Sequence, residues 1–192
     1  MRFLETIKVI DGIAQYLPYH QARVARTLGS KAFALEAVLQ DAPTQGIYRA
    51  RILYDGHRQQ ITYHPYVQQI PKSFALVYDD AIDYTFKYAD RTALEKLFDQ
   101  RGLAETVLII KNGAISDTPI ANVAFLKEGR WFTPDSPLLE GTTRARLIAS
   151  GLLHVSPIRV ADITAFEGFA VMNAMTGFVR IEDGIMAIKS MK

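Results

Sequence analysis

The sequence contains no cysteine among its 192 residues, which excludes disulfide bonds, thiolate metal sites and cysteine nucleophiles. No apolar run reaches the roughly 18 residues that a membrane-spanning helix needs, and residues 1–6 are too polar for a signal peptide. Acidic and basic residues are interspersed and sum to a net charge of +2, so no concentrated positive surface for nucleic acid is expected. We therefore expect a cytoplasmic protein that binds neither nucleic acid nor a membrane.

Two further kinds of catalytic site find no support. The four histidines lack the spacing of metal ligands, so no metal site is expected. No motif supports a serine or threonine nucleophile triad. The side chains that remain as candidates for catalysis are those with lysine, carboxylate or hydroxyl groups.

The chain is long enough, with 49% hydrophobic residues, to bury one large core or two smaller ones. In the first half, alternating and helical apolar patterns predict these elements: strands at 3–10 and 13–17, helices at 18–28 and 32–39, and strands at 47–54, 60–66 and 73–78. In the second half, they predict helices at 91–101, 141–151 and 162–166, and strands at 106–111, 115–116, 122–127, 130–133, 155–160 and 169–181. The change of pattern near residues 79–84 suggests a boundary between two lobes.

Lys87 stands in a polar and aromatic segment, Asp83-Tyr-Thr-Phe-Lys-Tyr-Ala-Asp-Arg91, directly before a predicted helix. A lysine amine becomes nucleophilic when burial or a neighbouring cation lowers its pKa, and it can then carry an aldehyde as a Schiff base. The alternative is a solvated lysine at a helix start. The surrounding motifs decide between the two.

A second segment has the character of a phosphate site. Glu140-Gly-Thr-Thr-Arg144 opens a predicted helix, and amides at such a helix start can hold a dianionic phosphate together with two threonine hydroxyls. An ordinary threonine N-cap is the alternative interpretation.

Several motifs in the same order resemble the class IV aminotransferase family of fold-type IV pyridoxal-phosphate enzymes. The resemblance covers residues 4 to about 181 and rests on these segments: Leu4-Glu-Thr-Ile-Lys-Val-Ile-Asp-Gly12, His20-Gln-Ala-Arg23, Phe86-Lys-Tyr88, Ile115-Ser-Asp-Thr-Pro-Ile-Ala-Asn-Val-Ala-Phe125, Trp131-Phe-Thr-Pro134 and Leu139-Glu-Gly-Thr-Thr-Arg144. It implies an α/β (α+β) fold with two lobes. We expect an N-terminal α/β sheet lobe at 1–82 and a C-terminal β-barrel-like lobe at 83–192 that carries the Schiff-base lysine.

The resemblance also implies a set of site residues for pyridoxal 5'-phosphate. Lys87 would be the catalytic lysine, Asp117 would face the pyridine nitrogen in place of the family's glutamate, and Arg23 would bind the phosphate. Thr142 and Thr143 would bind the phosphate as well. The alternative for Asp117 is a turn residue before Thr118-Pro119.

Other site residues come from two more segments. Ala170-Val-Met-Asn-Ala-Met-Thr-Gly177 resembles the lyase version of the family's late cofactor strand, which places Asn173 and Ala174 near the phosphate, although Asn173 could instead be a bulge or turn residue. Arg49 and Arg51 stand two apart on a predicted strand and share a face, so they could grip a substrate carboxylate or be merely exposed. The family favours Arg49 for that role, and Thr6 in the opening strand is the second candidate substrate residue.

The sequence begins almost at the opening strand, so we expect the Arg-Gly loop that precedes this strand and shapes the substrate pocket in relatives to be missing. The late strand and the opening Leu4-Glu-Thr6 favour an aminodeoxychorismate lyase, which makes 4-aminobenzoate and pyruvate. A branched-chain or D-amino-acid transaminase is the alternative, and a truncated, non-catalytic cofactor-binding protein is the alternative of another class. The family implies a homodimer and a small amine or amino-acid substrate.

Overall fold

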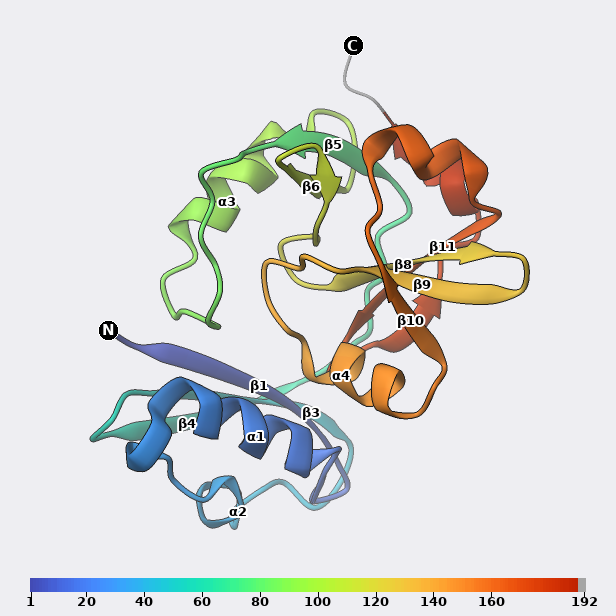
Figure 1. The fold of residues 1–192 in the computed structure, drawn as a ribbon. Helices are drawn as coiled ribbons and strands as arrows, with labels where there is room; N and C mark the ends of the chain where they lie inside the picture. Colours follow the sequence, from blue (N-terminus) through green and yellow to red (C-terminus); the bar gives the residue numbers. More distant parts are fainter. Residues whose placement is uncertain (190–192) are drawn as a thin grey trace. The chain divides into compact units, whose positions relative to one another are not determined.

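A computed structural model describes residues 1–189 of the chain (Figure 1). The contacts divide it into two compact units. Unit 1 comprises Met1–Gln69 and Phe86–Asp90, and unit 2 comprises Ile70–Thr85 and the described residues from Arg91 onward. Among the described residues, no helix is long and apolar enough to cross a membrane.

This division corrects the expected boundary at 82/83. Phe74–Tyr78 pairs in parallel with Thr106–Lys111 and so belongs to unit 2. The Lys87 segment belongs to unit 1, where the Leu4 amide donates to the Lys87 carbonyl at 2.8 Å. Both pairings join residues far apart in the sequence, which is why the local pattern did not reveal them.

Unit 1 is an antiparallel sheet with helices on one face. Its elements are β1 (Phe3–Ile10), β2 (Ile13–Ala14), α1 (Leu17–Leu28), a 3-10 helix (Gly29–Lys31), α2 (Leu35–Val38), β3 (Ile47–Tyr54) and β4 (Gln59–Pro65). The strand order is β2-β1-β3-β4. The face toward the helices is buried, and its core residues are Ile7, Val9, Ala50, Ile52 and Tyr54 from the sheet with Val24 and Leu35 from the helices.

Two predicted elements of unit 1 are shorter than expected. The returning strand at 13–17 stops at Ala14, because Leu17 and Pro18 already begin α1, where a proline in the first turn sacrifices no hydrogen bond. The predicted helix at 32–39 is reduced to the single turn α2. The remaining strands agree with the predictions to within one or two residues.

Unit 2 contains two sheets. Its elements are β5 (Phe74–Tyr78), α3 (Thr92–Phe98), a 3-10 helix (Asp99–Arg101), β6 (Thr106–Lys111), β7 (Ala114–Ile115), β8 (Asn122–Lys127), β9 (Arg130–Pro134), α4 (Thr142–Ala149), β10 (Leu153–Ser156), a 3-10 helix (Val160–Ala165), β11 (Gly168–Asn173), β12 (Gly177–Arg180), a 3-10 helix (Gly184–Ala187) and β13 (Ile188–Lys189). The five-stranded sheet has the order β10-β9-β8-β11-β12, and the four-stranded sheet has the order β13-β5-β6-β7.

The five-stranded sheet is covered on both faces. One face packs against the four-stranded sheet through a core that includes Phe74, Leu108, Phe125 and Phe169. The other face packs against α4 through Leu147, together with a second group of buried residues: Ala124, Leu153, Ala170 and Met172. The contact through Leu147 holds α4 against this sheet.

The sequence predicted a mixed α/β fold, and the structure confirms it. The expected barrel is not closed, because both sheets of unit 2 are open within residues 1–189. The predicted strand at 169–181 is two antiparallel strands, β11 and β12, joined by a turn. The predicted strand at 155–160 lies earlier, at β10, because Val160–Ala165 forms a 3-10 helix.

Candidate functional site

In unit 1, Arg23 is held by a buried carboxylate. Its Nε and Nη2 each donate to Glu5 at 2.7 Å, and His20 Nδ1 donates to the same carboxylate at 2.7 Å. Glu5 lies on β1 and is fully buried, whereas Arg23 and His20 lie on the inner side of α1. The three side chains therefore join the helix to the sheet.

The surroundings of Glu5 strongly stabilise its ionised form. Burial would raise the pKa of Glu5, but the charge of Arg23 and the hydrogen bonds from His20 and Arg23 outweigh it and lower the pKa to about 2. Glu5 is thus ionised at neutral pH and fixes the plane of the Arg23 guanidinium. The contribution of Arg23 to phosphate binding stays a prediction, and the structure adds a structural role to it.

Lys87 lies along the outer edge of β1. Phe3 and Tyr88 form an antiparallel bridge, and the Ala89 amide donates to the Arg2 carbonyl at 2.9 Å. The rings of Phe86 and Tyr88 both pack against Phe3, which in turn packs against Tyr54 on the helix-covered face. The Tyr88 amide also donates to the Phe86 carbonyl at 2.8 Å, so Lys87 is the central residue of a tight three-residue turn at this edge.

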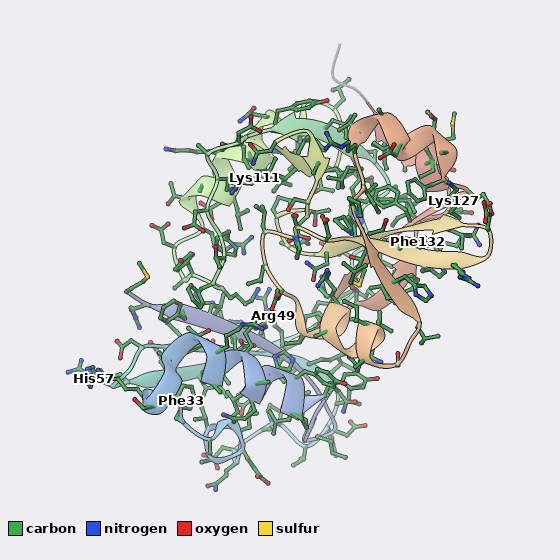
Figure 2. The ribbon with its side chains drawn as sticks, viewed as in Figure 1. Phe33, Arg49, His57, Lys111, Lys127 and Phe132 are labelled. Carbon is green, nitrogen blue, oxygen red and sulfur yellow. The ribbon has the colours of Figure 1, made fainter. Side chains whose placement is uncertain are left out.

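The face of the sheet opposite the helices is polar. The register places Thr6, Arg51 and Thr62 in one cross-strand row, and it places Lys8, Arg49 and His64 in the next row. Arg49 extends from the sheet on the side away from α1 (Figure 2). The structure therefore brings two predicted residues, Thr6 and Arg49, onto one face of the unit 1 sheet, with Lys87 at its β1 edge and Arg23 on the helix-covered face.

In unit 2, Asp117 is a buried carboxylate whose two oxygens have separate donors. Asn122 Nδ2 donates to Oδ1 at 2.8 Å, and the Leu139 amide donates to Oδ2 at 3.0 Å. The alternative of a simple turn residue is not what the structure shows, since the following turn is closed by the Thr118 hydroxyl and the Ala121 backbone. Asp117 instead ties its strand to the loop that leads into α4.

The electrostatics of Asp117 are unusual for an aspartate. Burial raises its pKa to about 6, although the hydrogen bonds from Leu139 and Asn122 and the charge of Arg144 act in the opposite direction. Within residues 1–189, no lysine, arginine or histidine nitrogen lies within 4 Å of this carboxylate. A cation placed beside Asp117 would therefore be bound favourably.

Thr142 and Thr143 are the first two residues of α4, and both are buried. The N-cap position is Gly141 and has no side-chain cap, so the alternative of a threonine N-cap is not what the structure shows. Among the described residues, neither threonine hydroxyl has a hydrogen-bond partner. The first amides of a helix also lack intrahelical partners, so α4 presents a set of donors for an anion.

Position 141 requires glycine because the Asn122 side chain lies against it. A Cβ atom at this position would lie 1.9 Å from Asn122 Oδ1, so no other residue fits without movement of Asn122. Asn122 Nδ2 also donates to the Leu139 carbonyl at 2.8 Å. Asp117, Asn122 and the 139–141 loop therefore form one network, which brings the predicted carboxylate and the predicted phosphate loop together within unit 2.

Asn173 has a structural role in the turn between β11 and β12. Its Oδ1 accepts hydrogen bonds from the Met175 and Thr176 amides, each at 2.9 Å, and its Nδ2 donates to the Ile120 carbonyl at 3.3 Å. Ala174 lies in the same turn. The turn interpretation of Asn173 is thus confirmed, and a cofactor contact by Asn173 or Ala174 stays a prediction.

The structure adds residues that the sequence did not single out as site residues. Asn122 was only part of a motif, and its role depends on contacts with a loop 17 residues away. Arg144 is buried and donates from Nη2 to the Pro134 carbonyl at 2.9 Å, which fixes β9 to α4. Buried side chains of this kind carry no local signal apart from their polar character within apolar strands.

A cavity of about 250 Å³ also lies in unit 2. It is lined by Asp83, Tyr84, Thr85, Lys111, Asn112, Ala114, Ser136, Pro137 and Leu138. None of these lining residues is a predicted site residue, so the cavity neighbours the loop before α4 without containing the network around Asp117.

Comparison with known proteins decides the family. The sequence profile of the family described as Amino-transferase class IV matches residues 84–183, which is more than half of the chain. The chain belongs to the class IV aminotransferase family. The matched region contains Lys87, Asp117, Thr142 and Thr143, whereas Arg23 lies outside it.

Two relatives of this class IV chain share about its length. A Haemophilus influenzae protein named only as uncharacterized is 37% identical over 182 residues, covering 90% of this chain and 97% of its own. The crystal structure of a "putative 4-amino-4-deoxychorismate lyase" from Haemophilus somnus 129PT is 32% identical with a TM-score of 0.86, covering 92% of this chain and 97% of its own.

A third structure shows the same fold in a longer protein. It is a hypothetical aminotransferase from Mycobacterium tuberculosis in a PLP-bound form, 20% identical with a TM-score of 0.77, covering 94% of this chain and 80% of its own. The fold of this class IV chain is therefore that of fold-type IV pyridoxal-phosphate enzymes, as the sequence predicted.

Proposed function

We propose that the chain binds pyridoxal 5'-phosphate and acts as an aminodeoxychorismate lyase, releasing 4-aminobenzoate and pyruvate. The observation that carries the cofactor assignment is the network in unit 2. A buried carboxylate without a cationic partner is hydrogen-bonded to the loop that opens α4, where two threonine hydroxyls and the helix amides are available. Pyridoxal phosphate carries both a basic ring nitrogen and a phosphate, so its two polar ends match these two features.

The residues that would hold the cofactor have distinct tasks. Asp117 would accept a hydrogen bond from the protonated pyridine nitrogen. Its direct donors among the described residues are neutral, the Asn122 amide and the Leu139 backbone, and burial strengthens a contact between opposite charges. Thr142 and Thr143 would donate to the phosphate together with the α4 amides. Arg23 would contribute its charge to the phosphate, with its guanidinium plane set by Glu5.

The cofactor, when bound, supplies an electron sink that stabilises negative charge on the carbon next to the substrate amine. Lys87 would first hold the cofactor through its aldehyde carbon. The substrate amine would then replace the lysine amine on that carbon. Lys87 Nζ would then remove the proton from the substrate carbon that bears the amine. Arg49 and Thr6, which share one face of the unit 1 sheet, would orient the substrate by binding its carboxylate and by donating from a hydroxyl.

The reaction after this proton transfer separates the candidate activities. Loss of a group from the neighbouring carbon gives the lyase, whereas return of the proton to the cofactor gives a transaminase acting on branched-chain or D-amino acids. The relative from Haemophilus somnus, identical at 32% of positions, supports the lyase through its name. The Mycobacterium tuberculosis structure supports a transaminase only at the level of the fold.

The test is a pair of product assays on the same preparation. With aminodeoxychorismate, the lyase should release pyruvate. With D- or L-amino acids and 2-oxoglutarate, a transaminase should release glutamate of a single configuration, D or L. Lys87→Ala should abolish whichever product is formed. Product in neither assay, despite bound cofactor, would favour the third proposal, a truncated cofactor-binding protein without turnover.

Two further predictions accompany this function. A homodimer is proposed from the family, and sedimentation at several protein concentrations would reveal it. A cytoplasmic location also stays a prediction, and fractionation of cells that express the tagged chain tests it.

A further inference from the structure

The polar face of the unit 1 sheet has an unusual charge pattern. Lys8, Arg49 and Arg51 all lie on it, and the one carboxylate in β1, β3 and β4, Glu5, lies on the opposite face. Within residues 1–189, none of the three cations has a carboxylate within 4 Å. The face is therefore a cluster of like charges that no residue of the described chain neutralises.

Such a cluster is disfavoured unless an anion offsets it. Lys8 and Arg49 stand directly opposite each other, and like charges in that position destabilise a sheet. Arg51 is two residues from Arg49 on the same strand, about 7 Å away. An anionic ligand that contacts both arginines would remove this repulsion.

The two rows have different chemistry. In one row Arg49 lies between Lys8 and His64, and in the other Arg51 lies between two threonines, Thr6 and Thr62. His64 Nε2 and the Thr62 hydroxyl are 3.1 Å apart, which places both side chains on this face. Each row thus combines a planar guanidinium with neighbouring donors, a combination that suits a carboxylate.

The Lys87 segment runs along the β1 edge of this sheet. The Lys87 carbonyl accepts a hydrogen bond from the Leu4 amide at 2.8 Å, and Leu4 stands two residues before Thr6 on β1, on the same face. The backbone of the proposed catalytic residue therefore borders the row that contains Thr6.

We propose that Arg51, with Thr6 and Thr62, forms a second carboxylate subsite beside Arg49, so that the site selects substrates carrying two carboxylates. The inference deepens the proposed function and rests on it for the role of Lys87. A substrate with one carboxylate would satisfy only one row and leave the other arginine unpaired. Arg51 is in this way a specificity-determining residue.

The test compares two unreactive probes, glutarate with two carboxylates and butyrate with one. Their dissociation constants are measured by calorimetry on the wild type, on Arg51→Gln and on Arg58→Gln. Arg58 lies outside the two rows, in the turn between β3 and β4, and the same charge is removed there. Far-ultraviolet circular dichroism and urea unfolding show that each variant is folded.

The wild type and Arg58→Gln should bind glutarate about tenfold or more tightly than butyrate. Arg51→Gln should weaken glutarate binding by roughly ten- to hundredfold, the loss expected for one charge-assisted contact, and leave butyrate within about twofold. Equal affinity of the wild type for both probes, no detectable glutarate binding, or equal weakening of both probes in Arg51→Gln would overturn the proposal. Inorganic phosphate that binds more tightly than glutarate would also overturn it.

The same titrations separate this proposal from the proposed function. They are repeated on Lys87→Ala, which cannot attach the cofactor but keeps both rows. A glutarate preference that persists without any cofactor band in the wild type would refute the function alone. A clear cofactor band without a glutarate preference would refute the subsite alone.

Discussion

Replacing Gly141 by alanine is a sharp test of the network in unit 2. Gly141 has φ −70° and ψ 146°, an extended conformation that alanine adopts without strain. The only obstacle is steric, since the new Cβ would lie 1.9 Å from Asn122 Oδ1 and 3.1 Å from Asn122 Cγ. The Asn122 amide cannot turn away without losing its bonds to Asp117 and to the Leu139 carbonyl.

The expected loss follows from these two bonds. A hydrogen bond to a charged group contributes about 1.5–3 kcal/mol and a neutral one about 0.5–1.5 kcal/mol, so Gly141→Ala should lower the free energy of unfolding by about 2–4 kcal/mol. Urea unfolding of the cofactor-free protein measures this loss. The change from glycine to alanine at an N-cap would by itself account for only about 0.5 kcal/mol.

A double-mutant cycle isolates the steric cause. In an Asn122→Ala background the obstructing amide is gone, so Gly141→Ala should cost less than about 1 kcal/mol there. A loss below about 0.5 kcal/mol in the wild-type background, or the same loss in both backgrounds, would refute the contact between Gly141 and Asn122.

Three further predictions concern charge and the cofactor. Glu5→Gln should lower the free energy of unfolding at pH 7, measured by urea unfolding, by about 3–5 kcal/mol, because it removes the buried carboxylate that pairs with the Arg23 charge. The pKa of Glu5 is about 2 in the folded protein against an ordinary 4.5. The stability that ionised Glu5 contributes is therefore complete above pH 4.5 and is lost as the pH falls toward 2. A wild type and variant whose stabilities depend on acid pH in the same way would contradict this. The pKa of Asp117 is raised from 3.8 to about 6, so the folded state binds the proton more tightly than the unfolded state. The free energy of unfolding of the cofactor-free protein should therefore fall by about 3 kcal/mol as the pH rises from 3.8 to about 6. Asp117→Asn should remove that slope, and an unchanged slope would show that another group causes it. Thr142→Val should weaken cofactor binding about tenfold by spectroscopic titration while it leaves the unfolding of the cofactor-free protein within about 1 kcal/mol; unchanged affinity would remove Thr142 from the phosphate site.

Local patterns predicted most of the individual elements. The alternation in Phe3–Ile10 and Ile47–Tyr54 follows from one face that is buried against α1, and such alternation is readable residue by residue. The two-residue turn at Asn112 and Gly113 was recognisable because the Asn-Gly pair favours positive φ angles, and both residues adopt them, at 52° and 73°. In these places the local preference and the final fold agree.

The assignment of segments to units could not be predicted in the same way. The expected boundary placed Lys87 with the C-terminal lobe, whereas its carbonyl pairs with the Leu4 amide, more than 80 residues earlier in the chain, and Ala89 pairs with Arg2. The strand Phe74–Tyr78 likewise pairs with a partner beyond the Lys87 segment. Pairings over such separations depend on tertiary packing, which a single sequence does not display.

The candidate site shows the same division. Lys87, Asp117 and the threonines of α4 were found through motifs, because residue type and order are visible in the sequence. The hydrogen bonds of Asn122 and the ion pair between Glu5 and Arg23 were not foreseen, since each joins residues on different elements. Arg23 in particular was predicted only as a phosphate ligand, which stays a prediction, and the structure shows its pairing with Glu5.

The central claim is that Lys87 holds the cofactor, and peptide mapping tests it most directly. The purified chain is incubated with pyridoxal 5'-phosphate, treated with borohydride to fix the cofactor to its lysine, digested and examined by mass spectrometry. We expect the added mass on the peptide that contains Lys87, and we expect its loss, together with the visible absorption band, in Lys87→Ala. Modification of another lysine such as Lys111 or Lys127 with Lys87 unmodified, or a band that persists in Lys87→Ala, would contradict the account.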